Sequence, residues 1–168
     1  MTDLPPGFEE FYLATKDRCF RAVLATVTNA HEADDLLAEA YTRAFARWSS
    51  VADHPAPSAW VVRTALNLHR DRWRKGRRPQ PASLVAEHKA TFSADVDPLI
   101  LASVARLPRR QREVVIYRVF LDLSAHETAR ELGIDSGTVG THLRRALDTL
   151  RSDLRESVAP TTSTEAHR

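Results

Sequence analysis

The chain has 168 residues, 43% of them hydrophobic, which excludes an intrinsically disordered protein and corresponds to one domain or two small ones. A net charge of +2 indicates no partner by itself, but a basic stretch at 63–78 and an acidic stretch at 32–39 suggest two surfaces of opposite sign. The single cysteine excludes an intrachain disulfide framework, and no apolar run approaches the roughly 20 residues that span a bilayer, so we expect a cytoplasmic protein without membrane insertion.

The amino-terminal part of the chain shows helical periodicity. Apolar residues recur at spacings of three and four between positions 8 and 27, which predicts a first helix that ends before Asn29. A second helix is predicted at 31–48, where Leu37 and Tyr41 share an apolar face.

A loop and a further helix are predicted next. The segment 49–58 contains Pro55 and Pro57, which disfavour a regular helix, so we expect a loop there. Ser58 is suited to cap the following helix, which is predicted at 59–74.

The middle of the chain is the best candidate for a linker. Residues 76–98 contain glycine and several prolines and show weak periodicity, apart from a short helix expected at 84–89. No convincing alternating strand or internal repeat occurs anywhere in the chain. We therefore predict an all-α protein of two small helical domains joined by a flexible linker, with a disordered polar tail; the boundaries are 1–75, 76–98, 99–155 and 156–168.

The carboxy-terminal part contains signals of a helix-turn-helix. Ser124 and Glu127 have the spacing of a capping box, and Gly133 can end the helix that they begin. Asp135 can cap the next helix, in which Val139 lies where an aliphatic residue would fix the two helices against each other.

The second helix of this motif has a surface suited to duplex DNA. Short side chains near its amino terminus, with Gly137 and Gly140 among them, would let the backbone approach a phosphate chain. A helical hairpin that only packs is the alternative, and the arginines that precede the motif could be ordinary solvated side chains. The predicted duplex-binding residues are Arg109, Arg110, Asp135, Ser136, Thr138, Thr141, His142 and Arg145.

The predicted helix at 59–74 has a basic face that begins with an aromatic residue. Stacking on an aromatic ring, charges for the backbone and an amide for a base edge suit single-stranded DNA. Core packing is an equal alternative for Trp60, and His69 is expected to be a packed histidine rather than a ligand. The residues predicted on the single-strand face are Trp60, Arg63, Asn67, Arg70 and Arg74.

Two segments of the chain resemble one protein family. The stretch "LPRRQREVVIYRVFLDLSAHETARELGIDSGTVGTHLRRALDTL" resembles the promoter-reading fourth region of bacterial sigma factors, although output domains of response regulators share much of this pattern. The stretches "HEADDLLAEAYTRAFARW" and "PSAWVVRTALNLHRDRWRK" resemble the sigma segments that dock on core RNA polymerase and handle melted promoter DNA. In this order they are similar to an extracytoplasmic-function (ECF) sigma factor of the sigma-70 class, over 8–154.

The resemblance implies partners and further site residues. It implies that promoter DNA and core RNA polymerase bind the chain, and that an anti-sigma factor is a potential partner. The loop before the third helix would capture a flipped promoter base with Asp53 and His54. The implied polymerase-binding residues are Asp34, Asp35, Leu36, Leu37 and Glu39.

The chain departs from the family pattern at several positions. Ala38 stands where a glutamine is common, and Gly140 and His142 stand where lysine and arginine are frequent, so some contacts of the family are missing.

Other classes of function fit less well. A stand-alone helix-turn-helix regulator that binds operator DNA without polymerase is the main alternative. An enzyme is disfavoured because the histidines are scattered, and because "HETAR" has Arg130 where a zinc-binding H-E-x-x-H motif needs its second histidine. We therefore expect no catalytic residues, no metal and no cofactor.

Overall fold

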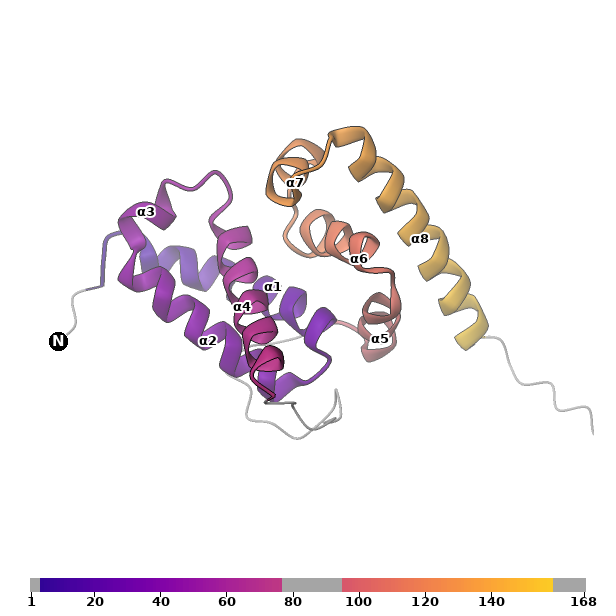
Figure 1. Cartoon of the computed structure of the whole chain (residues 1–168), viewed down its shortest axis with the longest axis horizontal. Coiled ribbons are helices and arrows are strands. Elements are labelled where there is room, and N and C mark those ends of the chain that lie inside the picture. Colours follow the sequence, from indigo (N-terminus) through magenta and orange to yellow (C-terminus); the bar gives the residue numbers. More distant parts are fainter. Residues whose placement is uncertain (1–3, 77–94, 159–168) are drawn as a thin grey trace, which may run out of the picture.

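The computed structural model describes residues 4–76 and 95–158. All regular secondary structure in these residues is helical, which confirms the expected all-α class. Figure 1 shows α1 to α4 gathered in one unit and α5 to α8 in a second unit beside it. Most of the predicted linker 76–98, including the short helix expected at 84–89, lies outside the described residues.

The amino-terminal unit is built on three long helices that pack against one another. They are α1 (Phe8–Val27), α2 (Ala30–Ala46) and α4 (Pro57–Arg74). The interruption predicted at Asn29 is an N-cap, because the Asn29 side chain accepts a hydrogen bond from the Glu32 N–H at 3.0 Å and so begins α2.

Two local predictions in this unit are wrong. The short helix α3 (Trp48–Ala52) occupies the start of the predicted loop 49–58, and it buries Val51 in the core. In addition, α4 begins at Pro57 rather than after a Ser58 cap. Proline has no backbone N–H, but the first turn of a helix leaves its N–H groups unpaired, so proline begins a helix here instead of preventing one.

Within residues 95–158, the carboxy-terminal unit has five helical segments. They are α5 (Pro98–Arg106), α6 (Arg109–Val115), the π-helical turn η1 (Ile116–Phe120), α7 (Ala125–Leu132) and α8 (Ser136–Val158). The last of these continues past the predicted domain end at 155, so the first residues of the predicted tail are helical, and the rest of that tail lies outside the described residues.

The two units pack directly on each other. Helix α1 contacts both α5 and η1, and the buried apolar side chains of the two units form one continuous cluster. The predicted arrangement of two helical units joined by a linking segment is confirmed, and in this conformation the two units are closed on each other, with α1 in contact with the carboxy-terminal unit.

Candidate nucleic-acid interface

The first helix of the predicted helix-turn-helix has the expected ends. The Ser124 Oγ accepts a hydrogen bond from the Glu127 N–H at 3.1 Å, and the Glu127 carboxylate accepts one from the Ser124 N–H at 2.7 Å. This capping box starts α7, and Gly133 ends it in the left-handed conformation with φ of 66°. Both sequence predictions for α7 are confirmed.

The second helix of the motif is capped and crossed as predicted. The Asp135 carboxylate accepts a hydrogen bond from the Thr138 N–H at 2.9 Å and another from the Thr138 hydroxyl, and these bonds hold the pKa of Asp135 below its usual value. Ala129, at 5% exposure, and Val139, at 0%, are buried together with Val114 where the helices cross. The Asp135 side chain is thus engaged in starting α8.

The capping box makes a pH-dependent contribution to stability. Hydrogen bonds from Ser124 hold the pKa of Glu127 below its usual value, so the ionised form stabilises the folded chain above the unfolded-state pKa, and this contribution is lost as the pH falls through the folded-state pKa. We expect Glu127→Gln to be less stable than the wild type at pH ~7, with the difference shrinking below pH ~4.5. Urea unfolding across this range measures the difference; a gap that widens in acid would contradict the assignment.

The outer face of α8 carries small and basic side chains. Gly137 and Gly140 are exposed, and a Cβ at Gly140 would meet no atom within 4 Å. Arg144 and Arg145 are exposed one to two turns farther along the same helix. The result is a surface with little bulk at its start and cations beyond it.

Arg144, which is not among the predicted duplex-binding residues, is exposed on the same outer face of α8. Val139 and Ala146 are fully buried, and at 100° per residue Arg144 then lies on the far side of the helix from both. The spacing of the apolar residues in the sequence also places Arg144 on the outer face of this helix. Conversely, His142 is half-buried, and its Nδ1 is enclosed with no hydrogen bond from the described residues, so it does not project outward as predicted.

The arginines at the start of α6 are exposed but partly neutralised. Arg109 and Arg110 both form ion pairs with Glu113 on the same helix, at 2.9 and 3.0 Å. Their guanidinium groups remain at the surface, where a phosphate could compete with the Glu113 carboxylate for them.

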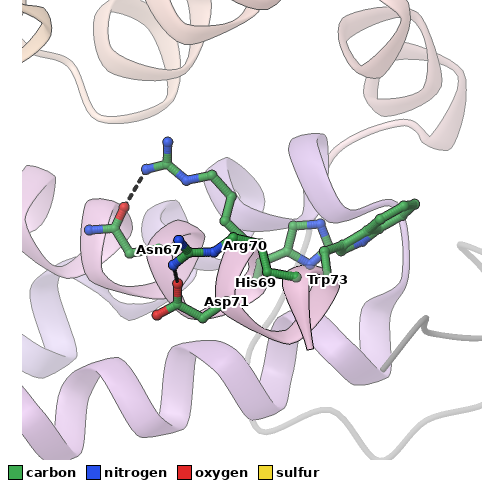
Figure 2. Close-up of a pocket in the computed structure, with 6 residues that line it drawn as sticks. Asn67, His69, Arg70, Asp71 and Trp73 are labelled. Atoms are coloured by element: carbon green, nitrogen blue, oxygen red, sulfur yellow. Dashed lines mark hydrogen bonds and ion pairs between the residues drawn. The ribbon is translucent and has the colours of Figure 1, made fainter. Parts of the chain in front are cut away.

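The carboxy-terminal half of α4 presents the predicted basic face. Figure 2 shows the Arg70 guanidinium donating to the Asn67 side chain. Arg74 forms an ion pair with Asp71 on the same helix. A hollow of about 760 Å³ lies over these side chains. The residues that line it are Asn67, His69, Arg70, Asp71, Trp73 and Arg74.

The two tryptophans of α4 differ in how far they are exposed. Trp60 is half-buried and packs against the apolar core, which favours the alternative of core packing. Trp73 is 51% exposed beside the basic residues. His69 is a packed histidine as expected, because its Nδ1 lies 2.8 Å from the buried Glu32 carboxylate.

Two predicted single-strand residues contact the other unit. The Glu131 carboxylate of α7 lies 3.5 Å from an Arg63 nitrogen and 3.7 Å from His54 Nε2. Asp53 remains exposed at the end of α3. In this conformation the carboxy-terminal unit therefore covers part of the predicted single-strand site.

The acidic helix α2 offers fewer residues to a partner than expected. Leu36 and Leu37 are 0% exposed and Asp34 is 9% exposed, so the prediction that these three side chains contact a partner is corrected. The reason is that α1 and α4 cover two sides of α2. Asp35 remains exposed, and Glu39 is at the surface in ion pairs with Arg43 and Arg72.

The described residues contain neither a metal-binding group nor a candidate membrane span. No set of three or more histidine, cysteine or acidic side chains in 4–76 and 95–158 could hold a metal ion. Within the same ranges no helix combines the length and apolar character that crossing a membrane requires.

Comparison with known proteins identifies relatives of both units. Residues 11–79 match the family model of sigma-70 region 2, and residues 99–150 match that of sigma-70 region 4. The chain is 31% identical over 151 residues to the RNA polymerase sigma-E factor of Streptomyces avermitilis, covering 88% of this chain and 84% of that protein. It is 30% identical over 143 residues to the ECF RNA polymerase sigma factor SigM of Mycobacterium tuberculosis, covering 83% and 73%.

Solved structures share the fold. The sigma factor RpoE of Bartonella quintana, in its complex with the anti-sigma factor NepR, superposes with a TM-score of 0.71 at 21% identity over 90% of this chain and 98% of that one.

Proposed function

Because the chain belongs to the sigma-70 family of RNA polymerase sigma factors, in its ECF group, we propose that its two units act on different parts of one promoter. An ECF sigma factor directs promoter recognition and transcription initiation, and it is not an enzyme. The carboxy-terminal unit, proposed as 99–155, reads the duplex minus thirty-five element. The amino-terminal unit, proposed as 1–75, binds core RNA polymerase and the melted minus ten element.

The geometry of α8 is the observation that carries the duplex-reading role. A crossed helix pair presents the amino-terminal face of α8, which is free of bulk at Gly137 and Gly140, followed by the exposed Arg144 and Arg145. A recognition helix enters the major groove in this way, with short side chains near the phosphates and cations that contact phosphate oxygens or guanine edges.

The exposed end of α4 supports the single-strand role. Asn67, Arg70 and Arg74 line one hollow together with Trp73, so an amide, two cations and an aromatic ring are available to one strand. Bases stack on aromatic rings and the backbone is held by charge. Asp53 stays in the proposed site as an exposed residue of the preceding segment.

The exposed acidic surface of α2 supports binding to core polymerase. Asp35 and Glu39 are accessible for a basic partner surface, whereas the leucines of α2 belong to the core. We propose the cytoplasm as the site of action, since promoter and polymerase are there in bacteria. We also propose an anti-sigma factor as a partner, because related sigma folds were solved with one, as in the RpoE–NepR complex.

Run-off transcription tests the proposed function against the stand-alone regulator. Core RNA polymerase is combined with a promoter library, with and without this protein, and promoter-specific transcripts are expected only when both proteins are present. A gel-shift assay on the same library with the protein alone should show no tight duplex binding. If the protein without polymerase binds duplex DNA tightly and no transcripts form, the stand-alone regulator is favoured.

A further inference from the structure

Glu131 forms an ionic contact between the two units. In Figure 1 its helix, α7, lies on the side of the carboxy-terminal unit that faces α4. The Glu131 side chain is only 4% exposed, and its ion-pair contacts are with Arg63 at 3.5 Å and His54 at 3.7 Å. The buried contact of α7 with α8 is instead made by Ala129 and Val139.

The carboxylate is held mainly by charge. Its buried Oε2 accepts no hydrogen bond from the described residues, and burial of a carboxylate is unfavourable unless cations compensate for it. His54 is oriented for this contact because its Nδ1 accepts a hydrogen bond from the Ala56 N–H at 3.0 Å, which leaves the ring proton on Nε2, facing Glu131. The contact therefore does not need a protonated histidine.

The surroundings make this carboxylate important for the closed conformation. A cavity of about 410 Å³ lies between the units, with Arg63 and Arg70 on the α4 side and Arg109, Arg110 and Arg112 on the α6 side. Like charges on opposite walls disfavour closure. Glu113 pairs with arginines of its own helix, so Glu131 is the lining carboxylate that pairs across to α4.

We propose that Glu131 is an intramolecular latch, which occupies Arg63 and His54 as a DNA phosphate would and holds the chain closed until its DNA site is needed. The proposal rests on the proposed single-strand role of α4. In the closed chain the Arg63 guanidinium and the His54 ring are engaged by Glu131, and opening releases them. The apolar contact of α1 with α5 and η1 acts alongside the latch.

A distance measurement on the full chain tests the latch. Spin labels at Thr42→Cys on α2 and Ser152→Cys on α8 report the separation of the units, since both positions are exposed and the native Cys19 is fully buried. Glu131→Gln should raise the ratio of open to closed chain about fivefold, whereas Glu156→Gln, which removes an exposed carboxylate from α8, should not. Equal distance distributions for wild type and Glu131→Gln would overturn the proposal.

Two further measurements separate the latch from its alternatives. Glu131→Arg alone should abolish closure, and the charge swap that combines it with Arg63→Glu should restore closure. If the swap does not restore it, general packing and not this ion pair holds the units together. Without polymerase, the Glu131→Gln variant should also bind a labelled random-sequence single strand more tightly than the wild type does. If the variant chain is open but its binding is unchanged, Glu131 does not mask the DNA site. A failure of the proposed function would appear elsewhere, as absent run-off transcription by the wild type.

Discussion

Replacing Leu36 by alanine is expected to lower the free energy of unfolding by about 3 kcal/mol. Leu36 is 0% exposed on α2, which is packed between α1 and α4, so the lost methyl groups leave a cavity that the surrounding helices fill only in part. Urea denaturation followed by far-ultraviolet circular dichroism measures the change. Loss of polymerase binding should then follow the fraction unfolded, as expected for a core residue.

The same substitution at an exposed leucine is the matched control. Leu13 lies on α1 with 59% exposure, so Leu13→Ala should change the free energy of unfolding by less than about 0.5 kcal/mol. If Leu36→Ala were as mild as Leu13→Ala but abolished polymerase binding, Leu36 would be a contact residue after all, and its place in the core would be wrong.

Removing both exposed arginines of the recognition surface is expected to reduce transcription about 100-fold. Each lost contact to a phosphate or a base edge weakens promoter binding by roughly 1–3 kcal/mol, and each phosphate contact contributes about one to the salt slope. The Arg144→Ala, Arg145→Ala double variant is compared with the wild type in run-off transcription at rising salt. Its fold should be unchanged, because both side chains are exposed.

Arg155→Ala provides the control on the same helix. Arg155 is exposed in the last turn of α8, far from the amino-terminal face that would enter the groove. Its replacement removes one positive charge, as each of the other two substitutions does, but leaves the proposed surface unchanged. Transcription by this variant should stay within about twofold of the wild type. A comparable loss from Arg155→Ala would indicate a general charge effect instead of a recognition surface.

The sequence by itself determined the features that depend on neighbours a few residues away. The capping box of Ser124 and Glu127, the left-handed Gly133 and the Asp135 cap are all present as predicted. Each is a hydrogen bond or a backbone angle within one turn, so side-chain chemistry and spacing are sufficient to specify it. The helical periodicity likewise predicted the all-α class, and the order of the two motif-bearing segments pointed to the family.

Only the tertiary structure decided which helices are packed on more than one side. Periodicity assigns one apolar face to a helix, but α2 is packed by both α1 and α4, so Leu36 and Leu37 are both buried. Near the end of α4, by contrast, Trp73 is 51% exposed. The pairing of Glu131 with Arg63 joins residues 68 positions apart, and such a contact depends on how the two units dock, which no local pattern encodes.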